Sequence, residues 1–161
     1  MPNHNLIRME ILNEAKLVER ELTFRNLQIN KEVMETRRSI VRWLALSLGV
    51  ISPGESRLTA VSVLDALLYF SFKEKRDPDV PEMITYIEKA WGPINEKTLR
   101  YHLLQLKKIN IASNSGGKYT LVWPDIGERY DAEGWVASYV DRETQQIKEK
   151  LKIAIKELKE R

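Results

Sequence analysis

Basic and polar side chains that can bind an anionic polymer are concentrated in one short part of this sequence. Between Ile94 and Lys118, five of the 25 residues are Lys or Arg and only Glu96 is acidic, so the segment carries a net charge of +4. The remaining 136 residues sum to −1, because the whole chain carries +3. Lys and Arg bind phosphate groups, and Arg and Gln can each make two hydrogen bonds to the edge of a base. The modest total charge therefore hides a basic segment with the chemistry of nucleic-acid binding.

The spacing of three leucines predicts that a helix positions these side chains. Leu99, Leu103 and Leu106 recur at i, i+4 and i+7, which places them on one face of a helix. Asn95 is a good N-cap, and Asn110 tolerates the left-handed conformation in which helices often end. Free N–H groups at the start of such a helix favour phosphate. Helical rotation turns four polar side chains mostly outwards, those of Lys97, Arg100, Tyr101 and Gln105.

The surrounding segments predict further helices and a hairpin. Apolar residues at helical spacing follow Thr59, a potential cap, to about Phe72, and the next helix begins at Pro81 and ends at Trp91. After Asn110 the pattern alternates, so that residues 111–114 and 118–123 favour strands joined by a Ser-Gly-Gly turn. Three helices followed by a hairpin, within about 65 residues, is the element order of a winged helix.

From Pro93 to Val122 the sequence resembles the winged helix-turn-helix superfamily of transcription regulators. The likeness is strongest over residues 94–111, where an apolar residue and a small polar cap precede Thr98 and an aliphatic residue, and a His-Leu pair follows. This pattern is similar to the recognition-helix signature of arsenical-repressor-like and related archaeal regulators, and the resemblance extends over residues 57–122. It implies that the helix of residues 95–108 enters the major groove of double-stranded DNA, while the hairpin approaches the flanking backbone or minor groove.

The resemblance also implies roles for individual residues. Together with the outward Gln105, the residues expected to contact DNA are Asn95, Lys97, Thr98, Arg100, Tyr101, His102, Lys107 and Lys118. Taken singly, Arg100 and Tyr101 are also typical of a solvated helix face, and His102 of a packed histidine. Leu104 departs from the family pattern, which has a polar residue there. It favours a second hypothesis, a winged helix used for protein contact in a transcription, replication or chromosome assembly.

The rest of the composition points away from catalysis. The chain has no Cys and two His, which excludes disulfides, Cys-ligated zinc, iron–sulfur clusters and thiol nucleophiles. No combination of nucleophile, base and stabiliser can be assembled, so we expect no enzymatic activity, no cofactor and no metal. Four carboxyl groups precede the last helix and could suggest a metal, although acids commonly precede helices. They belong to Asp125, Glu128, Asp131 and Glu133.

Other features admit two interpretations each. The four Trp residues are expected to anchor a core or an interface, with an effector pocket among them as the alternative. Arg37, Arg38 and Arg42 either extend a DNA footprint or form a solvated face, and we favour the solvated face. The longest apolar stretch, residues 43–51, is too short to span a bilayer, and the start of the chain lacks the features of a signal peptide. We therefore expect a cytoplasmic protein without membrane contact.

Amphipathic helices are predicted at both ends of the chain. The first would extend from Ile11 to Leu22, followed by a break and a second helix that Asn30 caps and that runs to Leu48. The last would carry a heptad seam from Val140 to Leu158 over about 25 residues. The two could pack within one chain or join two chains, and we expect a homodimer. The predicted dimerisation residues are Ile11, Val18, Leu22, Val140, Ile147, Leu151 and Leu158.

The sequence thus predicts a mainly α fold with a small β-hairpin, in which long terminal helices flank a winged helix-turn-helix core. The expected regions are residues 1–55 for helical packing or dimerisation, 56–123 for the winged helix, and 124–161 for a linker and a coiled-coil-like helix. The expected function is sequence-specific DNA binding by a homodimeric transcription regulator.

Overall fold

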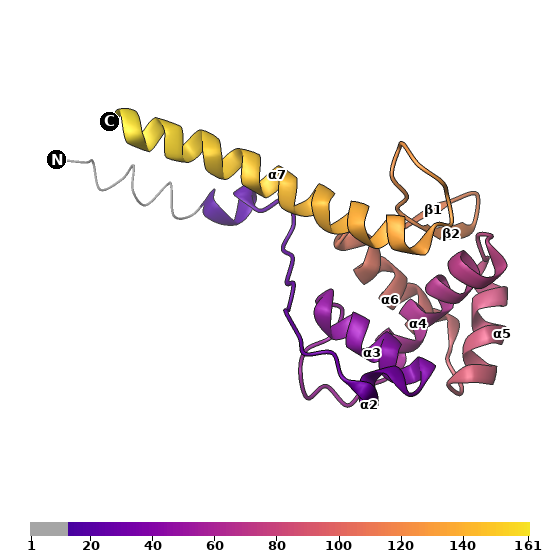
Figure 1. Ribbon diagram of the computed structural model, residues 1–161. Coiled ribbons are helices and arrows are strands. Elements are labelled where there is room, and N and C mark those ends of the chain that lie inside the picture. Colours follow the sequence, from indigo (N-terminus) through magenta and orange to yellow (C-terminus); the bar gives the residue numbers. More distant parts are fainter. Residues whose placement is uncertain (1–12) are drawn as a thin grey trace. The chain divides into compact units, whose positions relative to one another are not determined.

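The computed structural model describes residues 13–161, and the fold is mainly helical with one small antiparallel sheet, as predicted (Figure 1). The chain divides into two compact units, Met1–Pro53 and Gly54–Arg161. The second unit contains both the basic segment and the closing helix.

The first helix ends earlier in the chain than the sequence predicted. Residues 13–17 are helical and residues 18–30 are not, so the expected helix up to Leu22 is wrong beyond residue 17, while Ile11 lies outside the described residues. The non-helical segment is held to the rest of the unit by Arg25. Its backbone N–H donates to the Ser47 carbonyl at 2.9 Å, and its guanidinium donates to the carbonyls of Leu46 and Ile51. These bonds require an open backbone that a helix would not offer.

The predicted second helix is confirmed in type but is divided in two. Helix α2 (Lys31–Met34) begins at the predicted cap Asn30, whose side chain accepts from the Val33 N–H at 3.0 Å. Helix α3 (Arg37–Ser47) has its own cap at Thr36. Thr36 and Ser39 bond reciprocally, side chain to backbone, in a capping box that starts a new helix where the apolar pattern had indicated a continuous one.

In the second unit, α4 (Thr59–Tyr69) is the central helix. Its residues 60–68 are all buried, because α5, α6 and β2 all pack against it. Thr59 is the first helical residue rather than the predicted cap, and Leu58 at the cap position makes no side-chain bond. The helix continues as a π-helical turn, η1 (Phe70–Glu74), which ends at Lys75 in the left-handed conformation. The predicted end near Phe72 therefore falls within this turn.

Helices α5 (Val80–Ala90) and α6 (Glu96–Lys108) confirm the predicted boundaries closely. Pro81 lies in the first turn of α5, and Asp79 caps that helix by accepting from the Glu82 N–H at 2.9 Å. The side chain of Asn95 caps α6. Asn110 follows α6 with a φ of 61°, the left-handed exit that the sequence predicted.

The two strands form a hairpin with a two-residue turn. Strand β1 (Ala112–Ser115) pairs with β2 (Lys118–Leu121) so that Ser115 faces Lys118, and Gly116 and Gly117 both have positive φ, as such tight turns require. The segment before α5 joins this sheet, since Asp79 forms an isolated bridge with Lys118 and the Tyr119 N–H donates to the Pro78 carbonyl at 2.9 Å. The hairpin is thereby fixed to the start of α5.

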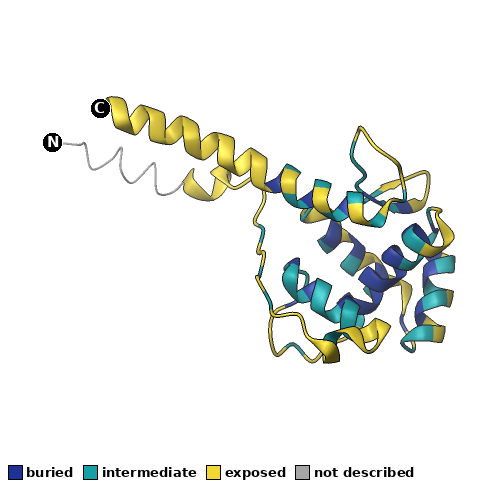
Figure 2. Cartoon of the chain, in the orientation of Figure 1, coloured by how far each residue is buried: buried dark blue, intermediate teal, exposed yellow. Residues whose placement is uncertain are grey.

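Helix α7 (Ala132–Glu160) is anchored at one end only. Trp135, Tyr139 and Glu143 are its buried residues, and every residue after Glu143 is exposed (Figure 2). The Tyr139 hydroxyl donates to the Ile109 carbonyl at 2.7 Å, and the Asn110 amide donates to Glu143 Oε1 at 2.7 Å. The anchored end of α7 is thus bound to the C-terminal end of α6. No helix of the described residues is long and apolar enough to cross a membrane.

A buried carboxyl group connects α4 with α5. Asp65 is 2 % exposed, and its Oδ2 accepts hydrogen bonds from the Tyr86 hydroxyl at 2.7 Å and from Trp91 Nε1 at 2.8 Å. Tyr86 in turn stacks on Tyr69 with ring centroids 4.4 Å apart. One acceptor therefore holds the middle and the end of α5 against α4.

We predict that Asp65→Ala lowers the free energy of unfolding by about 2 kcal/mol, because two partly buried donors lose their acceptor. Asp65→Asn keeps one oxygen at the site and is expected to cost about half as much. Urea denaturation of both variants measures the difference. Equal, small losses in the two variants would contradict this role of Asp65.

Candidate nucleic-acid interface

The exposed face of α6 is defined by the three leucines on its opposite face. Leu99, Leu103 and Leu106 are at most 2 % exposed, as the spacing predicted. The opposite face carries a central row at i, i+4, i+7 and i+11, formed by Lys97, Tyr101, Leu104 and Lys108, all of which are exposed. The row is 57 % exposed at Tyr101 and 48 % at Leu104, so it combines positive charge with accessible apolar surface.

The N-terminal end of α6 is ordered by its cap. The Asn95 side chain accepts from the Thr98 N–H at 2.8 Å, and both Asn95 and Lys97 are exposed. A capped, exposed helix start offers aligned N–H groups and a partial positive charge. Thr98 itself is only half-buried, and it lies at the edge of the face rather than at its centre.

Arg100 is exposed but is not isolated. Its Nε and Nη2 donate to Glu96 Oε1 at 2.9 and 2.8 Å, an i,i+4 ion pair in which both side chains are more than half exposed. The hydrogen bond from Arg100 to Glu96 is the main cause that raises the pKa of the guanidinium, and Tyr119 acts in the same direction. Arg100 therefore lies at the side of α6 that faces the hairpin, with its charge partly compensated.

His102 lies on the other side of the row and is half-buried. Its ring meets that of Tyr101 edge-on, with centroids 5.1 Å apart. Burial lowers the pKa of His102 below its usual 6.5, and the nearby Glu55 opposes this only in part. The imidazole is therefore mostly neutral at pH 7. It could donate a hydrogen bond to a phosphate group, but it would add no positive charge there. Gln105, predicted to point outwards, is half-buried on the same side.

The hairpin side of the face carries two further lysines. The Lys107 ammonium donates to Asn114 Oδ1 at 2.6 Å, which links the last turn of α6 to β1. Lys118 is exposed at the start of β2, beside the Gly116–Gly117 turn. Lys107 and Lys118 therefore extend the positive charge of α6 towards the hairpin tip.

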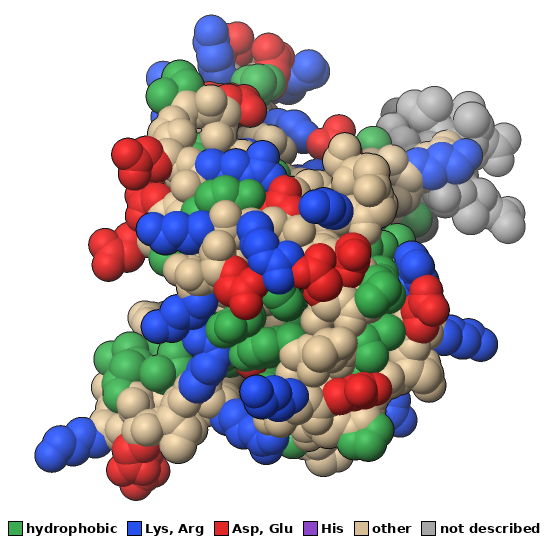
Figure 3. All heavy atoms as spheres, turned by 90° about the vertical axis from the view of Figure 1, so that its right-hand side faces the viewer, with side chains coloured by type: hydrophobic (Ala, Val, Ile, Leu, Met, Phe, Trp, Pro, Cys, Tyr) green, Lys and Arg blue, Asp and Glu red, His purple; other side chains and the backbone are tan. Residues whose placement is uncertain are grey.

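The surface on the side of α5 and the hairpin is mixed in sign. In the view of Figure 3, Lys and Arg side chains alternate with Asp and Glu and with exposed apolar groups. The basic character of residues 94–118 is thus a local property of α6 and the hairpin, not part of a molecule-wide field.

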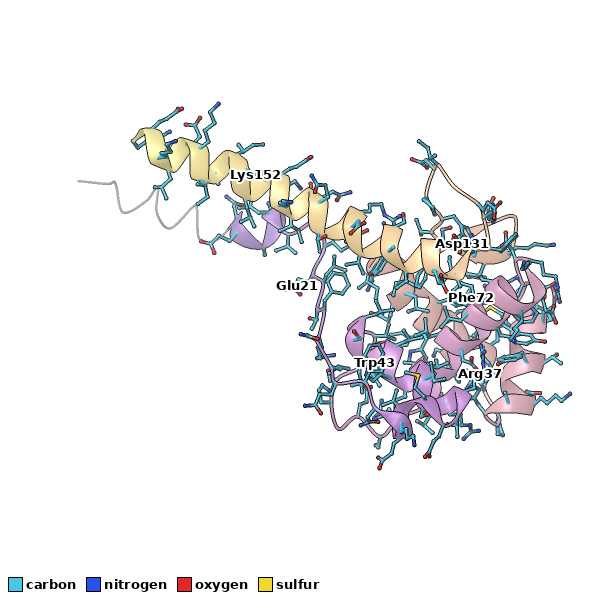
Figure 4. All side chains as sticks on the ribbon, viewed as in Figure 1. Glu21, Arg37, Trp43, Phe72, Asp131 and Lys152 are labelled. Atoms are coloured by element: carbon cyan, nitrogen blue, oxygen red, sulfur yellow. The ribbon has the colours of Figure 1, made fainter. Side chains whose placement is uncertain are left out.

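A clamp that the sequence analysis missed fixes the loop between β2 and α7. Asp77 accepts from Arg129 Nη2 at 2.6 Å and from the Tyr130 hydroxyl at 3.1 Å, and Trp123 packs edge-on against Tyr130 at 5.4 Å. Asp131 follows directly at the start of α7 (Figure 4). An Asp and an Arg 52 residues apart leave no periodic signal, so only the fold reveals the pair.

The predicted dimerisation residues fall in both units. Val18 is 56 % exposed and Leu22 is half-buried in the first unit, while Val140 is half-buried at the anchored part of α7. Ile147, Leu151 and Leu158 are 48 %, 60 % and 70 % exposed on the projecting part of α7. Pairing within the chain and pairing between chains both stay predictions.

The acidic loop does not assemble a ligand set. Within residues 13–161, no group of three or more His, Asp or Glu side chains is placed to hold a metal ion.

Comparisons of the chain with protein-family models, with curated proteins and with solved structures gave no match. The geometry of α6, the hairpin and α7 is therefore the basis on which a function is proposed.

We predict that His102 makes folding stability depend on pH. Because burial holds its folded pKa below the unfolded value of about 6.5, the unfolded chain binds the proton more readily. The stabilisation is full above about pH 6.5 and is lost as the pH falls through the folded pKa. Urea midpoints measured from pH 7.5 to pH 5 should fall more steeply for the unmodified protein than for His102→Gln. A slope that this variant leaves unchanged would refute the assignment.

Proposed function

We propose that the second unit is a winged-helix DNA-binding module and that the protein is a cytoplasmic, homodimeric transcription regulator without catalytic activity or cofactor. In this proposal α6 enters the major groove of double-stranded DNA and the hairpin is the wing. The terminal helices set the distance between two copies of the module.

The order and pairing of the elements support a winged helix. Helices α4, α5 and α6 precede the hairpin, and the segment between α4 and α5 adds a bridge to β2 through Asp79 and Lys118. This bridge pairs the segment before α5 with β2 and so ties the helices to the hairpin. The extended 122–131 loop then leads to α7 outside the module.

The exposed row of α6 is the observation that carries the proposal. Lys97 and Tyr101 lie at the centre of the face opposite the buried leucines, near the capped N-terminal end that would enter the groove. Arg100 and Lys107 flank the row towards the hairpin. An α-helix fits the major groove, and Lys or Arg on its outer face can bind both base edges and phosphates. Sequence-independent affinity would come from the net charge of +4 over residues 94–118.

A second candidate function, protein contact in a transcription, replication or chromosome assembly, is favoured by Leu104. This side chain is 48 % exposed in the middle of the row, where DNA offers little apolar surface besides the thymine methyl group. Electrophoretic retardation of a duplex by the pure protein separates the two functions. The protein-contact function is favoured if the pure protein does not retard the duplex and if Leu104→Ser abolishes binding to a protein partner.

We predict that duplex affinity falls steeply with salt and that Lys97→Gln weakens binding about tenfold at 100 mM salt. The variant should also lower the slope of log K against log salt by about 0.9, the value for one lost phosphate contact. Lys152→Gln is the matched control, because Lys152 lies on the projecting part of α7 (Figure 4). Fluorescence anisotropy at several salt concentrations measures both quantities. Equal effects of the two variants would contradict the role of α6.

We also predict opposite effects for the two partners of the exposed ion pair on α6. Arg100→Ala should weaken DNA binding by about 5- to 100-fold, because a groove-facing donor is lost. Glu96→Gln should strengthen binding by about 3- to 10-fold, because it removes the one acid of the segment and releases Arg100. Thermal unfolding should hardly change in either variant, since exposed ion pairs contribute little to stability. Weaker binding by both variants would instead indicate that the pair acts as a structural unit.

A further inference from the structure

The projecting part of α7 exposes an apolar row that its own unit does not cover. Ile147, Leu151 and Leu158 are 48–70 % exposed, and Ala154 between them is exposed as well (Figure 2). Their spacings of four, three and four residues match the 3.5-residue period with which one helix packs along another. In proteins most helical stability comes from the packing of an apolar face, so a covering helix would stabilise this part of α7.

The heptad positions follow from this row. Leu151 and Leu158 occupy a positions, while Ile147 and Ala154 occupy d positions. The flanking residues next to the seam are Lys148 and Ile155 at e, and Lys150 and Glu157 at g. These eight positions determine which orientation a second copy of α7 can adopt.

We propose that α7 pairs with α7 of a second copy in antiparallel orientation, about a two-fold axis that passes between residues 152 and 153. In this register Ile147 lies level with the partner's Leu158, and Leu151 lies level with the partner's Ala154. The two layers next to the axis each combine the large Leu151 with the small Ala154, so no layer there leaves two small side chains opposite each other. The symmetry also repeats the layer of Ile147 and Leu158 on the other side of the axis.

The charges beside the seam fit the same register. In antiparallel pairs g positions face g positions, so Lys150 meets the partner's Glu157, and the symmetry gives this opposite-charge pair twice. Positions e face e, so the aliphatic stem of Lys148 covers the partner's Ile155, which is otherwise 61 % exposed. Every flanking residue of the projecting part therefore gains a matching neighbour.

A parallel pair would use the same residues poorly. Ala154 would face the partner's Ala154 and leave a gap in the seam, and Lys150 would lie beside the partner's Ile155 rather than beside an acid. It would also bring the anchored ends of the two helices to about 10 Å from each other. The antiparallel pair separates these ends instead.

The distance between the two anchored ends can be compared with the repeat of the DNA major groove, a comparison that rests on the proposed function. Tyr139 and Glu143 bind the C-terminal end of α6, so the anchor of α7 is centred near residue 141. From there to the axis is about 17 Å at 1.5 Å per residue, so the two anchors lie about 35 Å apart. Adjacent major grooves on one side of B-DNA recur after about 34–36 Å. The pairing would thus place the C-terminal ends of the two α6 helices about one helical turn apart.

Cysteine cross-linking of the full chain tests the orientation, because the natural sequence has no Cys. We expect an equimolar mixture of Ile147→Cys and Leu158→Cys proteins, tagged differently, to form mainly the mixed disulfide on oxidation. A disulfide needs Cα atoms within about 7 Å, whereas two copies of residue 147 would lie about 17 Å apart in the antiparallel pair. Predominant Ile147→Cys homodisulfide, or a monomeric mass in sedimentation equilibrium at 100 μM, would overturn the proposal.

Charge reversal at exposed positions tests the register without disturbing the core. Lys150→Glu should weaken dimerisation at least tenfold, because it places two like-charge pairs in the dimer. Adding Glu157→Lys should restore the dimer constant to within about threefold of the original. Failure of the second change to rescue the first would overturn the proposed register.

Selection of bound duplexes from a random pool completes the test and separates the two proposals. Half-sites centred about one helical turn apart support the spacing, and abutting half-sites overturn it. Recovery of no duplex together with the mixed disulfide would refute DNA binding and leave the antiparallel pair supported.

Discussion

The left-handed turn at Asn110 is the constraint on which the arrangement of the second unit depends. With a φ of 61° it ends α6 and redirects the chain into β1, and its side chain donates to the buried Glu143 of α7. The preceding carbonyl, that of Ile109, accepts from Tyr139. Two consecutive residues therefore fix a helix, a strand and a distant helix to one another. An L-residue in this conformation is uncommon, and Asn is among the few that tolerate it while also supplying a side-chain donor.

Burial of Glu143 gives this junction its rigidity. A carboxyl group that is 2 % exposed is costly to bury unless it has partners, and here Asn110 donates to Oε1 of Glu143 while Arg142 Nε lies 3.5 Å from the same oxygen. The buried carboxyl group therefore restricts the position of α7, because a shift of the helix would break its hydrogen bond from Asn110. Asp65 does the same between α4 and α5. Two buried acidic side chains thus specify geometry in a core that is mostly apolar.

Local patterns were sufficient to predict much of this fold from the sequence. The caps Asn30 and Asn95, the buried leucines of α6 and the glycine turn are each encoded within a few residues, so spacing and residue type reveal them. The break at Thr36 was missed because an apolar period continued across it, although Thr and Ser three residues apart did encode the capping box. The non-helical course of the chain around Arg25 is held by bonds to residues more than 20 positions away, which no local pattern contains.

Attachment at one end only makes α7 a lever. Its projecting part is about 25 Å long, so a rotation of 10° about the junction moves its tip by about 4 Å. Whatever binds that tip is therefore positioned with an accuracy set by the hydrogen bonds that Asn110 and Ile109 make to α7 and by the ring contact between Phe72 and Trp135. Small rotations at this junction are therefore magnified at the tip of α7. The stiffness of the junction between α6 and α7 is therefore a property on which natural selection can act.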